Sequence, residues 1–218
     1  MTDADQLRTG TLDRAAWVPF AEGRSLEEAS ALAVDWVEVQ CARQCVSGVL
    51  LTSSFGIETF VPALTDFTRR HRQTTPRAGN RSEFRGVPVL AYFPNLKMMV
   101  QAISSARGSS LAVVEAPDFA LSGWARETRA TDLTDPNAVV APLNRRLVEG
   151  IAHLHSYGNN AYTTGFGRDQ AQRVLRELRS EGHLDQDAIL GAVLARGMSE
   201  HAIERLKQLI TEVKGKPR

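Results

Sequence analysis

Short, continuous apolar runs alternate with amphipathic segments between residues 25 and 135 of the chain. The apolar runs are CVSGVLLTSS (45–54), VPVLAYFP (87–94) and SSLAVVEAP (109–117). Between them, apolar residues recur at helical spacing in the sets Ile57, Phe60, Val61, Leu64, Phe67 and Leu96, Met99, Val100, Ile103. Continuous apolar runs are typical of strands covered on both faces, and their alternation with helices predicts right-handed βαβ units.

Weaker patterns complete this part of the chain. The residues SLEE (25–28) form a capping-box pattern, which predicts a helix that begins after Ser25. A short helix at LSGWARET (121–128) and a weak fourth strand at RATDL (129–133) follow the third apolar run. The prediction is an α/β domain over residues 25–135, with a Rossmann-like, mostly parallel sheet of three to four strands.

Helical spacing alone marks the chain after Asp135-Pro136. Its four stripes are Leu143, Leu147, Ile151, Leu154; Ala171, Val174, Leu175, Leu178; Ile189, Leu190, Val193, Leu194; and Ile203, Leu206, Ile210, Val213. This pattern predicts an all-helical C-terminal module over residues 136–218. Residues 1–24 are mostly polar around an apolar group at Ala15–Phe20, so we expect an N-terminal arm there.

Composition places the 218-residue chain among ordinary globular proteins, with 43% hydrophobic and 23% charged residues. No apolar run approaches the length of a membrane span, and the first residues lack a signal-peptide pattern. Cys41 and Cys45 lie four positions apart, a spacing on a helix that suits reduced thiols better than a disulfide. A cytoplasmic protein is expected.

Charge along the chain is balanced except in one segment. The net charge is +1, so any anionic partner must be attracted by a local patch. Of 26 basic residues, all except four lysines are arginine, which indicates GC-rich codon usage such as that of actinobacteria and predicts a bacterial origin. The segment RRHRQTTPRAGNRSEFRG (69–86) holds six arginines: Arg69, Arg70, Arg72, Arg77, Arg81 and Arg85.

Three interpretations of this arginine-rich loop stay open. It is a solvated, exposed connection, or a clamp for nucleic acid or phosphate, since guanidinium groups donate paired hydrogen bonds to phosphate, or a segment that contacts the protein's own acidic surface or a partner subunit. No aromatic residue alternates with the arginines, so base stacking is not indicated.

Polar residues follow each predicted strand at its carboxyl end. They are Ser53, Ser54 and Gly56 after the first strand, Asn95 and Lys97 after the second, and Glu115 after the third. In open α/β sheets ligands bind beyond the carboxyl ends of the strands, so these residues are candidates for the binding of an anionic ligand.

The same residues also have structural interpretations. Ser53 or Ser54 can be the N-cap of the following helix. Glu115 can be a cap or an ion-pair partner of an arginine, or else a base or metal ligand, which makes it a weak catalytic candidate. No P-loop, G-x-G-x-x-G or G-x-S-x-G motif is present, and the five histidines suggest no metal site. The sequence identifies no cofactor.

The segment LARGMSEHAIERL (194–206) resembles the centre of a helix-turn-helix. Its second helix is not basic, since it carries Glu200, Glu204 and Glu212 against Arg205 and Lys207. Helical packing or binding of a protein partner, including a second copy of the chain, is therefore favoured over DNA reading.

Three functions remain open at the level of sequence. The first is a binding or regulatory protein that holds an anionic small molecule or nucleic acid at the strand-end crevice and the arginine-rich loop. The second is an enzyme acting on a phosphorylated or nucleotide substrate through Glu115. The third is a structural or oligomerising protein. A second carboxylate or a metal beside Glu115 would favour chemistry.

Overall fold

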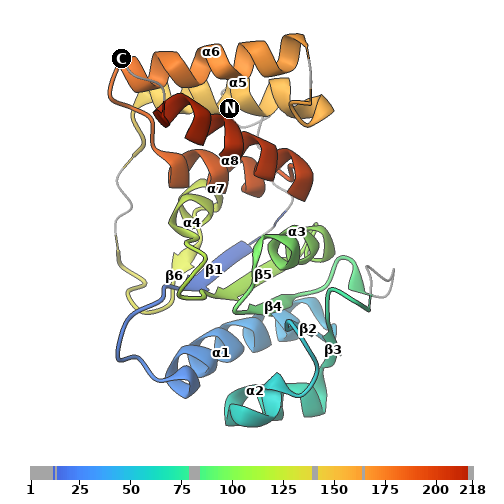
Figure 1. Ribbon diagram of the computed structural model, residues 1–218. Helices are drawn as coiled ribbons and strands as arrows, with labels where there is room; N and C mark the ends of the chain where they lie inside the picture. The colour runs from blue at the N-terminus through green and yellow to red at the C-terminus, as the bar shows by residue number, and fades with distance from the viewer. Residues whose placement is uncertain (1–11, 13, 79–83, 139–141, 164, 216–218) are drawn as a thin grey trace. The chain divides into compact units, whose positions relative to one another are not determined.

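The computed structural model describes residues 12, 14–78, 84–138, 142–163 and 165–215 of the chain (Figure 1). These residues fall into two compact units. The α/β unit lies within Met1–Phe119 and Thr128–Pro136, and the helical unit within Ala120–Glu127 and Asn137–Arg218.

The α/β unit is built on a parallel sheet. Its strands are β1 (Arg14–Val18), β2 (Val49–Leu51), β3 (Arg72–Thr74), β4 (Val89–Tyr92), β5 (Ser110–Val114) and β6 (Thr131–Asp132). All of the pairings are parallel, and the strand order is β3-β2-β4-β5-β1-β6. The predicted α/β class is confirmed. The predicted number of three to four strands is wrong, because the sheet has six.

The two unpredicted strands have weak local signals. β1 lies between β5 and β6, so the prediction of an N-terminal arm is wrong for these five residues. It holds two alanines, which are poor strand formers, and its burial comes from the neighbouring strands. β3 has the polar sequence RQT and lies at the edge of the sheet, within the segment predicted to be a loop.

Helices cover both faces of this sheet. They are α1 (Leu26–Gln44), α2 (Pro62–Arg70) and α3 (Leu96–Ser105), with α1 and α2 on one face and α3 on the other (Figure 1). The Ser25 hydroxyl accepts the N–H of Glu28 at 3.0 Å, which confirms the predicted start of α1. The helix predicted from Ile57 begins instead with a 3-10 turn, η2 (Ile57–Phe60), and α2 follows from Pro62.

The core between the sheet and α1 is made by alternate residues of the strands. Leu50, Leu90 and Ala112 occupy the same level of β2, β4 and β5, and all three are fully buried. Ala33 and Val37 of α1 pack in the same cluster. Removing this apolar surface from water, at about 25 cal/mol per Å², is the dominant stabilising contribution.

The helical unit contains α4 (Ser122–Thr128), α5 (Arg145–Tyr157), η4 (Gly158–Asn160), α6 (Phe166–Ser180), α7 (Gln186–Ala195) and α8 (Glu200–Gly215). The described residues between 143 and 213 contain no strand, which confirms the predicted all-helical module. Most members of the four stripes are buried, with Leu143 and Leu190 half-buried.

The helix α4 belongs to the helical unit, although its sequence was predicted to close the α/β domain. Gly123 of α4 and Gly191 of α7 face each other's backbones. A Cβ at Gly123 would lie 2.0 Å from the Asp187 carbonyl oxygen, and one at Gly191 would lie 2.2 Å from the Trp124 nitrogen. The two helices therefore approach as closely as glycine allows.

Candidate functional site

The carboxyl ends of the strands form one rim of the sheet, where the sequence predicted a ligand. At this rim β2 leads to η2 and α2 on one face, whereas the adjacent β4 leads to α3 on the other. Neighbouring strands whose connections leave to opposite faces create the crevice in which α/β proteins bind ligands.

Ser53 and Ser54 lie exposed at this crevice, and neither is a helix cap. Gly56 is the N-cap of η2 and Val61 that of α2, and both lack a side-chain cap. The Thr52 hydroxyl donates to the Ser54 carbonyl oxygen at 2.9 Å, and this bond stabilises the turn between β2 and η2.

The amide groups predicted to hold an anion are already bonded to carboxylates of the chain. The Gly56 N–H lies 2.9 and 3.1 Å from the two carboxylate oxygens of Glu58. Gln73 donates to the same carboxylate at 2.6 Å. At the start of α2, the Ala63 N–H bonds both oxygens of Glu27 at 3.2 Å. Negative charge at helix N-termini is stabilising, and here the protein itself supplies it.

Asn95 and Lys97 follow β4 on the same rim. The Asn95 side chain accepts the N–H of Met98 at 3.0 Å and is thereby the N-cap of α3. The Lys97 side chain is exposed. β2 and β5 are separated by β4, so Ser54 and Glu115 follow strands about 10 Å apart. Each predicted residue lies at the carboxyl rim, but the hollow that Glu115 lines includes none of the other five.

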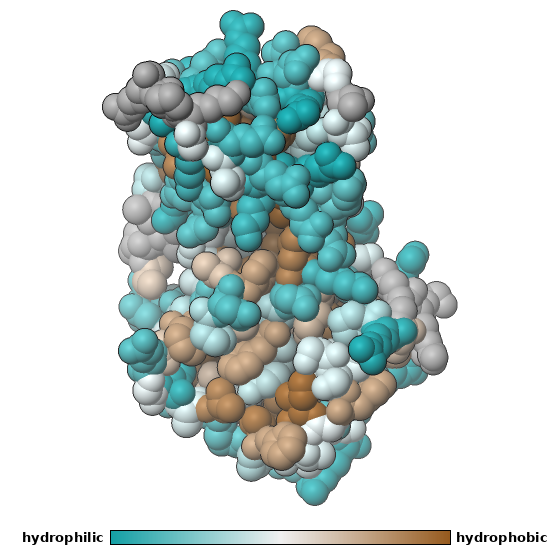
Figure 2. Space-filling model, in the orientation of Figure 1, coloured by the Kyte–Doolittle hydropathy of each residue, from teal (hydrophilic) through white to brown (hydrophobic). Residues whose placement is uncertain are grey.

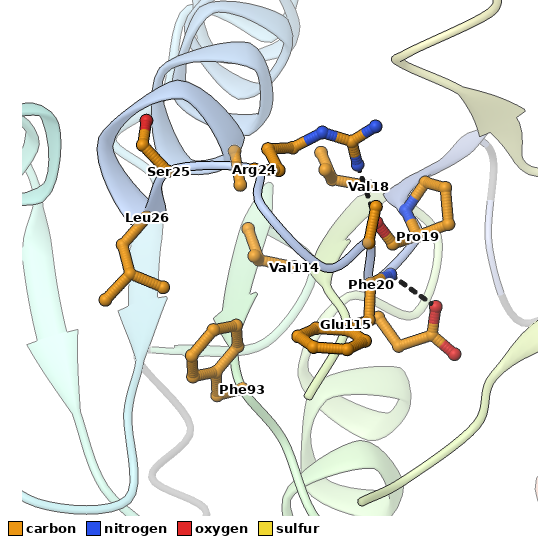
Figure 3. A pocket seen from close by; sticks show the side chains of 11 residues that line it. Val18, Pro19, Phe20, Arg24, Ser25, Leu26, Phe93, Val114 and Glu115 are labelled. Carbon is orange, nitrogen blue, oxygen red and sulfur yellow. Dashed lines mark hydrogen bonds between the residues drawn. The ribbon is translucent and has the colours of Figure 1, made fainter. Parts of the chain in front are cut away.

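Glu115 lines a small hollow beside the end of β1 (Figure 3). Glu115 is only 8% exposed, and its carboxylate accepts the backbone N–H of Phe20 at 2.9 Å. Arg24 donates to the Pro19 carbonyl oxygen at 2.7 Å and stabilises the loop that follows β1. Phe93 and Leu26 complete the walls. The hollow measures about 30 Å³, which is room for roughly one water molecule.

Exposed apolar side chains accompany the hollow. Phe20 is 47% and Leu26 50% exposed, and Phe55 and Phe60 of the η2 corner reach 63% and 84%. Figure 2 shows apolar residues gathered over α1 and α2 of the α/β unit. This rim is thus apolar and acidic, and it is poorly suited to a phosphate.

The six arginines of the predicted loop have different positions. Arg69 and Arg70 end α2 and pair with Asp66 and Glu38, each at 2.8 Å, and Arg72 begins β3. The prediction that they belong to a loop is therefore wrong for these three. Arg77 and Arg85 are exposed, and Arg81 lies outside the described residues.

Arginines from distant segments gather at the opposite rim of the sheet, where its strands begin. Arg14 begins β1, Arg85 and Arg107 precede β4 and β5, and Arg129 precedes β6. Arg43, at the end of α1, precedes β2. We name the exposed residues Arg14, Arg43, Arg69, Arg70, Arg72, Arg85, Arg107 and Arg129 the arginine rim.

Two arginines of the arginine rim have carboxylate partners in the described residues: Arg69 pairs with Asp66 and Arg70 with Glu38. Asp13 and Glu83, adjoining in sequence, lie outside the described residues. Sequence reasoning missed the arginine rim because its members are scattered from position 14 to 129. The available signal was the recurrence of an arginine shortly before each strand.

A buried imidazole lies below the arginine rim. His71 Nε2 is 2.9 Å from a carboxylate oxygen of Glu38, and its Nδ1 accepts the Gly48 N–H at 3.1 Å. The side chain is 8% exposed. Both ring nitrogens are engaged, so this histidine joins α1, α2 and the start of β2 as a structural element.

The helical unit offers a shallow groove of about 310 Å³, lined by Arg126, Asn144, His183 and Asp185 among others. The turn between α7 and α8 has the predicted form, with Gly197 at φ +80°. In the part of the chain that is described, no three His, Cys, Asp or Glu side chains group as a metal site would require. Nor is any described helix long and apolar enough to cross a membrane.

Comparisons with known proteins add no family to these observations. The chain was compared with protein-family models, with curated protein sequences and with solved structures, and none of the three comparisons found a match.

Proposed function

We propose that the protein binds nucleic acid through the arginine rim, without turnover. The observation that carries this proposal is the segregation of charge within the α/β unit. A chain of net charge +1 places eight exposed arginines along the amino-terminal rim of one sheet.

The chemistry of the guanidinium group suits this role. Its planar fork donates two parallel hydrogen bonds to a phosphate and keeps its charge at any physiological pH. Each phosphate that is neutralised releases condensed counterions, which drives association at low salt. A row of guanidinium groups along a rim is therefore matched to a polymer of phosphates.

A structural explanation accounts for part of the arginine rim. Arg43, Arg69 and Arg70 lie in the last turns of α1 and α2, and Arg107 follows the C-cap of α3. Cations at helix C-termini contribute about 0.3–1 kcal/mol each through the helix dipole. Arg14 begins β1 and Arg85 precedes β4, so the dipoles of α1, α2 and α3 do not explain these two arginines.

Codon usage does not explain why arginines and carboxylates lie at opposite rims. An arginine-rich composition would distribute arginine over every surface of the α/β unit. The carboxyl rim instead collects acidic residues around Arg24, Arg77 and Lys97; they are Glu22, Glu27, Glu28, Glu58, Glu115 and Asp118. Opposite charges at opposite rims support selection for an anionic partner at one of them.

The enzymatic alternative has less support. It depended on Glu115 facing a second carboxylate or a metal. The contacts of Glu115 instead include the Phe20 N–H, in a hollow of about 30 Å³ that is too small for a substrate. The strand-end crevice likewise gives little support to an anionic ligand, since Glu58 and Glu27 hold its helix amides.

The proposal is tested by fluorescence anisotropy with a labelled oligonucleotide duplex at about 50 and 200 mM salt. We expect the triple variant Arg14→Gln, Arg85→Gln, Arg107→Gln to bind at least about tenfold more weakly than the parent chain at low salt. The matched control removes the same charge from the helical unit through Arg173→Gln, Arg176→Gln and Arg205→Gln. Absence of binding at low salt, or equal losses in the two triple variants, would contradict the proposal.

A further inference from the structure

The geometry of the arginine rim points to the kind of nucleic acid it takes. We infer that it holds a double helix by its phosphates and reads no bases, an inference that rests on the proposed function. The shared chemistry is the duplex phosphate backbone, which both DNA and RNA duplexes present.

The extent of the arginine rim is the first observation. Six strands spaced about 4.8 Å apart give a rim about 24 Å long, which matches about seven base pairs at 3.4 Å each. The arginines also come from both faces of the sheet. Arg43 and Arg70 end the helices of one face, whereas Arg107 follows α3 of the other. This breadth suits a duplex rather than one extended strand.

The lack of a stacking surface is the second observation. Proteins that hold single strands place exposed aromatic side chains beside the bases. In the described rim segments the rings are those of Phe67 and Phe84, which are 0% and 7% exposed, and His71, whose side chain is 8% exposed. All three are buried, so unpaired bases would find no aromatic partner here.

The direction of the helices is the third observation. A reading helix enters the major groove and presents its side chains to base edges. At the arginine rim α1, α2 and α3 end, and the short segments that follow them return directly to strands of the sheet. Within the described residues of the α/β unit, none of α1, α2 and α3 continues past its end into a helix beyond this rim. Phosphate contact then determines the affinity, and the sequence of the duplex should matter little.

The salt dependence can be predicted from these contacts. If four to eight of the arginines each neutralise one phosphate, the slope of log K against log salt lies between about −4 and −7 for a duplex. Removing one contacting arginine should make this slope less steep by about 0.9.

The experiment uses the full chain and four probes of about 16 nucleotides or base pairs: two DNA duplexes of unrelated sequence, an RNA duplex and a thymidine single strand. We expect the DNA duplexes to bind equally within about twofold, and at least about tenfold more tightly than the single strand at the same salt. Comparable binding of the RNA duplex, or its exclusion, identifies which duplex is the source of the phosphates, and both are consistent with the inference.

Single substitutions complete the test. Arg14→Gln and Arg85→Gln should each make the slope of log K against log salt less steep by about 0.9, whereas Arg205→Gln in the helical unit should leave it unchanged. Arg85→Lys retains the charge but loses the paired hydrogen bonds, so it should keep the slope while affinity falls. Thermal unfolding of each variant verifies that it folds.

The outcomes separate the two proposals. Equal or tighter binding of the single strand would overturn the duplex inference and leave nucleic-acid binding standing. A difference above about tenfold between the two DNA duplexes would show base reading and would also overturn it. If none of the probes binds, both proposals fail.

Discussion

The carboxylate of Glu115 accepts a hydrogen bond of 2.9 Å from the backbone N–H of Phe20, a residue 95 positions earlier in the chain. The bond joins the end of β5 to the loop that follows β1. Glu115 N also donates to the Val18 carbonyl oxygen at 3.0 Å. Glu115, a site residue predicted from the sequence, thus connects the end of β5 to the chain that follows β1.

Replacing Glu115 should therefore reduce stability. Glu115→Ala removes the acceptor of the part-buried Phe20 N–H, which should cost about 1–3 kcal/mol in the free energy of unfolding. Glu115→Gln keeps a carbonyl oxygen and should cost less. Urea denaturation measures both, with the exposed Glu22→Ala as control. Equal stability of Glu115→Ala and the parent chain would show that water replaces the carboxylate without loss.

The buried histidine gives a second prediction. His71→Ala leaves the Gly48 N–H without its acceptor and Glu38 without its imidazole partner, so we expect a loss of about 1–3 kcal/mol. Arg69→Ala removes an ion pair whose side chains are 73% and 60% exposed, and it should change stability by less than about 1 kcal/mol. A similar effect of the two substitutions would argue against the structural role of His71.

The contact between α4 and α7 gives a third. Gly191→Ala places a Cβ 2.2 Å from the Trp124 nitrogen, so the helices must separate, at a cost of about 1–3 kcal/mol or more. Gly215→Ala, at the end of α8, meets no atom within 4 Å and should be neutral or slightly stabilising. Thermal unfolding monitored by circular dichroism compares the two. An unchanged melting temperature for Gly191→Ala would show that α4 does not pack closely against α7.

The two thiols should differ in reactivity. Burial, with a smaller effect of the Glu38 charge, raises the pKa of Cys41 to about 11, whereas Cys45 is exposed. The thiolate is the reactive form of cysteine. Cys45 should therefore react with a disulfide reagent at pH about 8 in the native protein, and Cys41 only on unfolding. The variant Cys45→Ser should abolish the fast phase. Retention of a fast phase in that variant would show that Cys41 is accessible.

Tyr162 predicts a loss of stability in alkali. Its hydroxyl donates to the Leu154 carbonyl oxygen at 2.6 Å, and burial raises its pKa above the ordinary value. A folded-state pKa above the unfolded value of about 10 means that its contribution is fully present below pH 10 and is lost as pH rises above it.

The corresponding measurement is the free energy of unfolding between pH about 8 and 11. Tyr162→Phe should be less stable at neutral pH, by about 1 kcal/mol, but should lose less stability in alkali than the parent chain. Parallel curves for the two proteins would show that Tyr162 ionises as readily in the folded as in the unfolded chain.

The helices and the three apolar strands were predictable from the sequence because their signals are local. Periodic burial identifies a helix within a few turns, and the cap at Ser25 acts across three residues. The all-helical C-terminal module follows from the same periodicity. Local signals fail for β1 and β3, which are short, hold alanine or polar residues, and gain their burial from neighbouring strands.

The candidate site depended on the tertiary structure. The carboxyl ends of three strands could be identified from the sequence. The sequence did not indicate that Glu58 and Glu27 would accept the N–H groups at the starts of η2 and α2, or that Glu115 would accept the N–H of Phe20. The arginine rim was equally hidden, because Arg14 and Arg129 become neighbours only through the pairing of β1 with β6. Periodicity is set by the residues next to each other in the chain. The order of strands is set by the burial of surfaces that are distant in sequence, and that order decides which charges meet.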